Sequence, residues 1–199
     1  MFNMSKLSPS ITDMIRFDHS HVMVTFHQYT TTAKPSVKKA LAETICDALE
    51  IHATLEEEIF YPVIRRLDPT EPAIIKAEPE HDEMQRLIRE LRNCKVADSR
   101  HDTILHDLMR DVMHHVADEE TVILPSAERL LGSDRLNELG AAMTRRRLEL
   151  IKPKMGKIAK NTAVGFSGST TAIVVGLAGA LVAARFVSKK MPDGAISQP

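Results

Sequence analysis

Two segments of the chain carry a histidine followed four residues later by a glutamate: His52 with Glu56, and His115 with Glu119. Each histidine is also followed ten residues later by a proline. Four residues are just over one turn of an α-helix, so the imidazole and the carboxylate project from the same face. Imidazole nitrogen and carboxylate oxygen together suit iron, manganese or zinc. The repeated spacing therefore predicts a metal site.

A second pair of motifs precedes these two at matching distances. His19 lies 33 residues before His52, His81 lies 34 residues before His115, and an acidic residue directly precedes both. The chain thus repeats a unit of two helices, and two such hairpins related by a pseudo-twofold axis would bring these side chains to one centre. In that centre the two glutamates bridge two metals and each metal takes two histidines. The candidate metal ligands are His19, His52, Glu56, His81, His115 and Glu119.

Helices must position these residues, because apolar residues recur at helical intervals along four long segments. The expected helices span residues 10–32, 36–66, 79–93 with a short helical approach over 73–78, and 100–131. Pro79 fits the first turn of the third helix. Short connections make neighbouring helices antiparallel, so the sequence predicts an all-α fold, an up-down four-helix bundle over residues 10–131. Ser133 or Asp134 then caps an additional helix over residues 133–152.

Several residues near the motifs have more than one interpretation. His114 is the alternative to His115, although the repeat favours His115. Tyr61 is expected to be an ordinary tyrosine at the edge of the core, with donation to a bridging oxygen as the alternative. Histidines without a counterpart in the repeat are expected at the surface or its boundary: His21, His27, His101 and His106.

The acidic neighbours of the candidate ligands are also open to two interpretations. Glu57 and Glu120 either orient ligands through hydrogen bonds or face water. Asp18 and Glu80 either accept a ligand N–H or only complement the helix dipole. A dry apolar pocket beside the metals is expected from residues such as Leu55, Ile59 and Val122.

These motifs resemble the hemerythrin-like HHE cation-binding family over about residues 10–131. The matching segments are Asp18-His19, His52 to Glu57 with Phe60-Tyr61-Pro62, Glu80-His81, and His115 to Glu120 with Leu124-Pro125. The resemblance implies an up-down bundle around a non-haem centre of two iron ions, bridged by carboxylates and by an oxo or hydroxo group.

Two departures from the oxygen-carrying members matter. Those proteins have an additional histidine four residues before the third-helix ligand, where this chain has Ala77, and an aspartate five residues after the last histidine, where this chain has Glu119 at four. One iron thereby loses a nitrogen ligand and gains an open position. The resemblance therefore favours sensing, iron handling or chemistry on an oxidant at least as much as oxygen carriage.

Composition limits the expected partners and the expected cellular location. The net charge of −1 and the absence of tryptophan give no case for nucleic acid as a partner. Cys46 and Cys94 make neither a disulfide framework nor a thiolate metal site, and residues 1–9 lack the pattern of a secretory signal. A reducing cytoplasmic location is expected.

The last part of the chain differs in character, because residues 162–184 carry no charge. Two interpretations of the glycine- and alanine-rich segment 162–187 stay open. Small residues at every fourth place are common in membrane helices, so it could anchor the bundle to the inner face of the membrane. Alternatively, it packs as a helix against the bundle or against a second subunit of a homo-oligomer.

The sequence leads to three functional hypotheses. The first is a hemerythrin-like di-iron protein that binds or senses oxygen or a related small oxidant, in iron homeostasis or stress defence. The second is a di-iron enzyme that reduces peroxide or nitric oxide. The third is an interaction module with a structural metal, since zinc or manganese also suits these donors.

Overall fold

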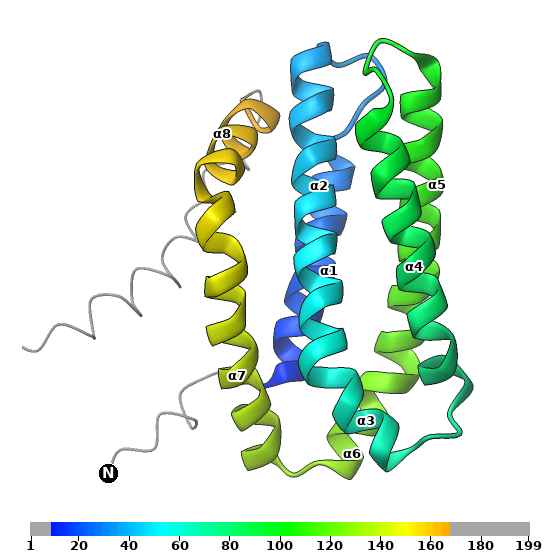
Figure 1. The fold of residues 1–199 in the computed structure, drawn as a ribbon, viewed down its shortest axis with the longest axis vertical. Coiled ribbons are helices and arrows are strands. Elements are labelled where there is room, and N and C mark those ends of the chain that lie inside the picture. The colour runs from blue at the N-terminus through cyan, green and yellow to red at the C-terminus, as the bar shows by residue number, and fades with distance from the viewer. Residues whose placement is uncertain (1–8, 168–199) are drawn as a thin grey trace, which may run out of the picture.

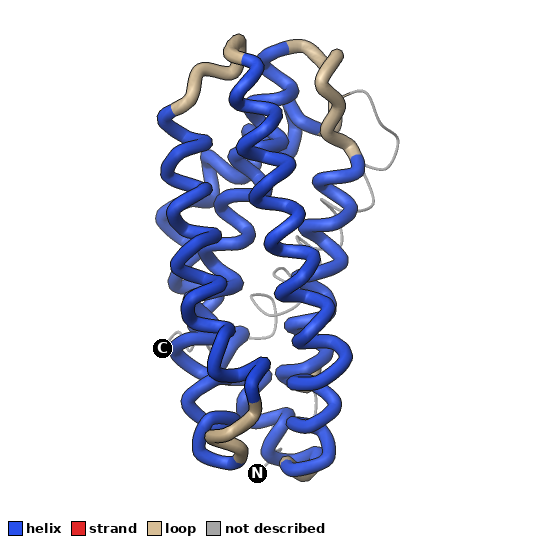
Figure 2. Tube along the Cα trace, turned by 90° about the vertical axis from the view of Figure 1, so that its right-hand side faces the viewer, coloured by secondary structure: helices blue, strands red, loops and turns tan. Residues whose placement is uncertain are grey.

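The computed structural model describes residues 9–167, and every regular element in this part is a helix (Figures 1 and 2). Four long helices form an antiparallel bundle: α1 (Ile11–His27), α2 (Pro35–Leu55), α4 (Pro72–Asn93) and α5 (Ser99–Asp118). Two of them continue through a π-helical turn, α2 through η2 (Glu56–Phe60) into α3 (Tyr61–Leu67), and α5 through η3 (Glu119–Ile123) into α6 (Leu124–Leu130). The remaining elements are α7 (Ser133–Ile151), the 3₁₀ turn η4 (Lys152–Lys154) and α8 (Met155–Gly165). The predicted all-α bundle with an additional helix is confirmed.

Local sequence signals explain where the bundle helices begin. The Ser10 hydroxyl accepts a hydrogen bond from the Asp13 N–H, and the Asp98 carboxylate accepts one from the Arg100 N–H. Each satisfies a backbone donor that the first helical turn leaves free. Proline occupies the first position of both α2 and α4, where its missing N–H costs nothing.

Two apolar clusters fill the bundle, one toward each end. The first includes Leu41, Ile45, Leu105 and Leu108, and the second includes Ile15, Phe60, Ile74 and Leu124. Along each long helix, the change from one cluster to the other falls at the candidate ligand histidine or within one residue of it. The polar centre is therefore enclosed by apolar packing above and below.

Two expectations about the helices were wrong, and one helix was not predicted. Helix α1 ends at His27 and not at residue 32, because three consecutive threonines follow and β-branched residues favour helix less. Pro79 lies inside α4, which runs unbroken from Pro72. Pro79 has no N–H to donate to the carbonyl oxygen of Ile75, four residues earlier. Ile75 is exposed, so water can donate to this carbonyl instead. Helix α8 was not expected.

Helices α7 and α8 dock on the bundle by close approach and by ion pairs. A Cβ added at Gly140 of α7 would lie 2.1 Å from the Pro9 carbonyl oxygen, and one at Gly165 would lie 2.9 Å from Leu41 Cδ2. Buried Asp47 of α2 also pairs with Lys157 of α8 at 3.0 Å. Glycine is needed at position 140, because a side chain there would meet backbone atoms at the start of α1, whereas at position 165 the Leu41 side chain could shift to make room.

The membrane-anchor prediction concerns residues 162–187, most of which lie outside the described residues. Residues 162–165 belong to α8. Among residues 9–167, no helix combines the length and the apolar character needed to cross a bilayer. Attachment to a membrane through this segment stays a prediction.

A buried polar network closes the end of the bundle where α1 meets α2. The Tyr29 hydroxyl donates to Asp102 Oδ1 at 2.5 Å, and its oxygen lies 3.2 Å from His101 Nδ1, which can donate to it. The Lys38 ammonium pairs with the same Asp102 oxygen at 2.6 Å. His101 is buried, so its expected surface position was wrong, whereas exposed His27 and His106 agree with the expectation.

This network predicts a pH-dependent stability. Burial and the Lys38 ammonium lower the pKa of His101 from its ordinary 6.5. As the pH falls below 6.5, the His101 imidazole is protonated in the unfolded chain before it is protonated in the folded chain. The folded state therefore loses stability until the pH reaches the lowered pKa of His101 in the folded chain. Relative to His101→Asn, which keeps an N–H donor, we expect the unfolding free energy of the wild type to fall between about pH 7 and about pH 5. Urea unfolding of metal-free protein at several pH values measures this difference, and parallel curves would contradict it.

Candidate metal centre

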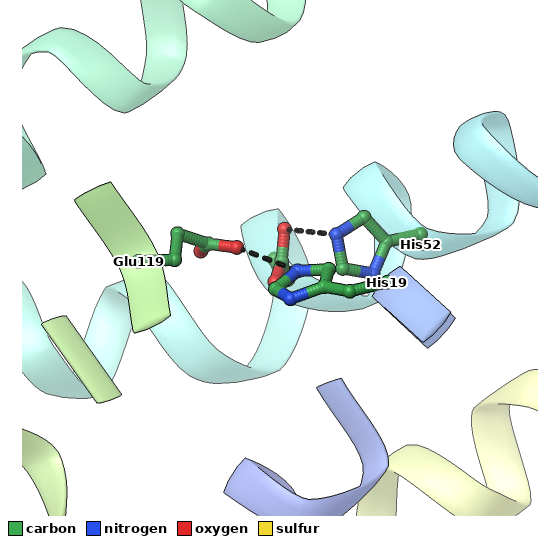
Figure 3. Close-up of side chains that lie close together, drawn as sticks. His19, His52 and Glu119 are labelled. Carbon is green, nitrogen blue, oxygen red and sulfur yellow. Dashed lines mark hydrogen bonds and ion pairs between the residues drawn. The ribbon is translucent and has the colours of Figure 1, made fainter. Parts of the chain in front are cut away.

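The four bundle helices and the two π-helical turns bring the six predicted ligands together, all of them buried. One group comprises His19, His52, Glu56 and Glu119, and a second comprises Glu56, His81 and His115. Within each group the potential ligand atoms lie within 4.8 Å of one another. Figure 3 labels three members of the first group and shows the Glu119 carboxylate directed at His19, beside His52. Because Glu56 belongs to both groups, the arrangement has the form of two adjoining cation sites.

Each of the two glutamates is the first residue of a π-helical turn. The Tyr61 N–H bonds to the Glu56 carbonyl oxygen, and the Leu124 N–H bonds to the Glu119 carbonyl oxygen, five residues back in both cases. Pro62 and Pro125 follow directly. Proline clashes with the carbonyl four residues before it, and the wider turn relieves this clash. The repeated proline is therefore the sequence signal for the π-helical turns, which helical periodicity alone does not predict.

The π-helical turns correct the expected pocket. An extra residue in a turn rotates everything after it by about 100° around the helix axis. Val122, predicted to line the pocket, is 36% exposed, and its neighbour Ile123 is buried instead. In the same way Phe60 replaces partly exposed Ile59 in the core. Leu55 is buried, but it does not line the cavity beside the four imidazoles, so the expected pocket lining was wrong for all three residues.

Every one of the four imidazoles presents Nδ1 to a carboxylate outside the central cluster. The Nδ1–oxygen distances are 2.8 Å for His19–Glu120, 2.9 Å for His81–Glu57, 2.9 Å for His115–Glu80 and 3.5 Å for His52–Asp18. The pairing follows the internal repeat, because equivalent residues pair in both halves. At His19, His81 and His115 the acid is within hydrogen-bond distance of Nδ1, where it can hold the proton and leave Nε2 facing the centre, which is how proteins orient metal-binding histidines. Exposed His114 takes no part, whereas His115 does.

The two central carboxylates have opposite electrostatic character despite their equivalent positions. Burial and the Glu119 charge raise the pKa of Glu56 well above its ordinary 4.5. Burial alone would also raise the pKa of Glu119, but hydrogen bonding to His19 and the nearby imidazoles of His115 and His52 lower it. In the metal-free protein the centre therefore favours a proton on Glu56 and the negative charge on Glu119.

The pKa values of the imidazoles also shift in opposite directions. Burial lowers the pKa of His52, and burial with the neighbouring His115 lowers the pKa of His81 to about 3. Burial would lower the pKa of His19 too, but Glu119 and Glu120 raise it. Neutral imidazoles at His52 and His81 are in the protonation state that binds a metal.

The donor set fits cations because some of its centre-facing atoms have no hydrogen-bond partner within the described protein. His52 Nε2 and both carboxylate oxygens of Glu56 are buried without a hydrogen bond. His52 Nε2 and Glu56 Oε2 nevertheless lie only 3.2 Å apart. Buried polar atoms are normally satisfied, and unsatisfied ones that converge on one point indicate a missing ion.

A family model for the hemerythrin HHE cation-binding domain matches residues 10–127. The chain belongs to this family. The predicted family resemblance is thus confirmed, and with it the capacity to bind cations. That the six clustered residues are the ligands stays a proposal.

Two further proteins are similar to this chain. The crystal structure of an HHE cation-binding domain-containing protein from Mycobacterium kansasii superposes with a TM-score of 0.64 at 16% identity, covering 76% of this chain and 93% of that one. This likeness shows the shared fold. A DNA nickase from Nostoc sp. is 26% identical over 133 residues, which cover 67% of this chain but only 38% of the relative.

Tyr61 distinguishes the two halves of this HHE domain, because its equivalent in the second half is Leu124. Its hydroxyl donates to Glu119 Oε1 at 2.6 Å in a fully buried position. The expectation of an ordinary core-edge tyrosine was therefore wrong. The Tyr61 ring lies 5.7 Å from that of His81, and both Tyr61 and Ala77 belong to the second apolar cluster.

Removing this hydroxyl should destabilise the metal-free protein. A hydrogen bond to a buried charged group contributes about 1.5–3 kcal/mol. We therefore expect Tyr61→Phe to lower the unfolding free energy by about that amount, measured by urea unfolding after chelation. Phe60→Leu, which changes only apolar packing beside it, provides the comparison for general core damage. An unchanged unfolding free energy in Tyr61→Phe would show that the hydroxyl is not bonded as described.

Proposed function

We propose that this HHE protein is a non-haem di-iron protein that binds oxygen or a related small oxidant, namely peroxide or nitric oxide. The observation that supports it is the buried set of four imidazoles and two carboxylates in two groups that share Glu56. Mixed nitrogen and oxygen donors suit iron, and pairs of iron ions in bundle cores are held by such residues. Sensing the oxidant, defence against it, or iron handling are the uses that this centre would serve.

In this proposal the residues of the chain have distinct tasks. Glu56 and Glu119 would bridge the two cations, and each imidazole pair would hold one of them. The outer carboxylates fix the imidazole orientation. The iron ions would supply electrons to the bound oxidant. Because this chain has Ala77 where the oxygen-carrying members have an additional histidine, one iron would keep an open ligand position, which favours sensing or reaction over oxygen carriage.

The size of the neighbouring cavity supports a small ligand. A cavity of about 20 Å³ adjoins His19, His52, His81 and His115 and is otherwise lined mainly by apolar side chains. This volume holds about one molecule the size of water. A diatomic molecule or peroxide would fit, and an organic substrate would not.

Val112→Ile tests the role of this cavity. Val112 of α5 is buried and lines it, and the added methylene would occupy most of the free space. We expect a slower spectral response of the iron-loaded protein to oxygen, by about tenfold, with unchanged iron content. Val63→Ile, whose site is not among the residues that line this cavity, is the matched control. Equal rates in wild type and Val112→Ile would exclude the cavity as the route of the ligand.

The decisive experiment for the function is anaerobic purification, metal analysis and absorption spectroscopy before and after air is admitted. We expect about two iron ions per chain and a spectral change in air. A protein that retains zinc, shows no spectral change in air and loses helicity on chelation would instead have a structural metal.

An enzyme that reduces peroxide or nitric oxide is the second candidate. The Tyr61 hydroxyl favours it, because a proton donor lies 2.6 Å from a central carboxylate. Catalytic turnover by the iron-loaded protein that falls sharply in Tyr61→Phe would support this candidate. Stoichiometric binding without turnover would support the first.

DNA cleavage is not part of the proposal. The match to the Nostoc nickase covers 38% of that protein. A net charge of −1 also gives no electrostatic reason to bind nucleic acid.

A further inference from the structure

Helix α7 lies beyond residues 10–127, which the family model matches, yet it reaches the metal centre. Its Arg147 binds the Asp18 carboxylate with both terminal nitrogens, at 2.5 Å for Nη1–Oδ1 and 2.6 Å for Nη2–Oδ2. Both side chains are largely buried. A two-point bond of this kind fixes the carboxylate in position and in orientation.

Asp18 in turn faces the candidate ligand His52. Its Oδ2 atom lies 3.5 Å from His52 Nδ1, while His52 Nε2 points toward Glu56 at 3.2 Å. Asp18 Oδ2 is also the atom that Arg147 Nη2 binds. A continuous chain of polar contacts thus runs from α7 through α1 to the centre.

The other half of the centre has no equivalent brace among the described residues. Glu80 corresponds to Asp18 and faces His115 at 2.9 Å. The positively charged side chain beside Glu80 is that of Lys76, which lies 3.8 Å away on the same helix and is 49% exposed. An exposed pair of this kind fixes geometry weakly. The two halves of the repeat therefore differ in how firmly the outer carboxylate is held.

We propose that Arg147 is a positioning residue of the metal centre: through Asp18 it orients His52, so that α7 is needed for tight binding at the His19–His52 position. The two cation positions are then unequal, the α7-braced position being the tighter. This inference rests on the proposed two-metal site. It adds to that site a helix that the family model does not include.

The test uses the full chain and zinc as the probe, so it does not depend on iron chemistry. We expect Arg147→Gln to lower the affinity for one of the two zinc ions by about tenfold, which is the lower end of the range for residues that orient metal ligands. The affinity for the other zinc ion should change by less than about twofold. Competition with a chromophoric chelator measures both affinities. Arg145→Gln makes the same charge change at an exposed position of the same helix and should have no effect.

A double-mutant cycle with Asp18→Asn distinguishes positioning from simple loss of helix docking. If Arg147 acts through Asp18, Arg147→Gln should weaken zinc binding in the wild-type background and change it less than about twofold in the Asp18→Asn background. An equal loss in both backgrounds would show that Arg147 acts only by holding α7 in place. Equal affinities of Arg147→Gln and Arg145→Gln would also overturn the proposal. A wild type that binds no zinc or iron would instead refute the proposed two-metal site itself.

Discussion

Replacing His52 and His115 together by alanine is expected to reduce metal loading from about two ions per chain to nearly none. Each substitution removes one imidazole from a different group of the centre. Loss of one ligand among the few protein donors of a metal lowers its affinity by orders of magnitude, and removal of one metal leaves the bridging carboxylates uncompensated for the other.

Metal analysis of the purified variants, after equilibration with a competing chelator, measures this loading. The control is His106→Ala with His114→Ala, which removes two exposed histidines and leaves the centre intact. Full loading in the His52 and His115 double variant would refute the proposed ligand set. Single variants that each lose one ion would show which imidazole pair serves which position.

Opposite changes in stability are expected when the two central glutamates are replaced by glutamine in the metal-free protein. Glu56 has two buried oxygens without a hydrogen bond, whereas Glu119 accepts a hydrogen bond from Tyr61 at 2.6 Å and lies 3.0 Å from His19 Nε2. Glu56→Gln removes a poorly compensated acid and should raise the unfolding free energy by about 1–3 kcal/mol at neutral pH. Glu119→Gln weakens charge-assisted hydrogen bonds and should lower the unfolding free energy by about 1.5–3 kcal/mol. Both variants should bind metal more weakly.

The direction of each pKa shift determines how the stability change of each glutamine variant depends on pH. The pKa of Glu56 is raised above its ordinary 4.5, so its favourable contribution is full below that pH and is lost as the pH rises. The advantage of Glu56→Gln should therefore appear above about pH 4.5 and grow toward neutrality. The pKa of Glu119 is lowered, so its contribution is present at neutral pH and fades in acid, and the deficit of Glu119→Gln should fade with it.

Urea unfolding of the chelated proteins at several pH values measures both differences. Glu57→Gln and Glu120→Gln are matched controls, since each changes a partly exposed acid beside the site. Destabilisation by Glu56→Gln at neutral pH would mean that Glu56 has a partner in the metal-free protein. Stabilisation by both variants would contradict the opposite roles of Glu56 and Glu119.

The internal repeat made the candidate centre visible in the sequence. Helical periodicity is a local property, so His52 and Glu56 had to share a face whatever surrounded them. The pseudo-twofold repeat then indicated that His19 and His81 face the same interior, because two equivalent hairpins must bury equivalent faces. The same reasoning predicted the four-helix bundle, and the motifs themselves carried the resemblance to the HHE family.

Features that depend on one extra residue or on distant partners were not visible in this way. The π-helical turns shift the buried face by one position, which turns Val122 outward and Ile123 inward. Periodicity assumes a constant turn, so it cannot register such a shift unless the repeated proline is recognised as its cause.

The sequence by itself determined which residue types repeat, on which helices and on which faces, because those are properties of neighbours in the chain. Only the tertiary structure decided that Tyr61 donates to Glu119, that His101 is buried against Tyr29, and that Arg147 reaches Asp18. These partners are 58, 72 and 129 residues apart. Their contacts depend on how whole helices pack, which no local pattern encodes.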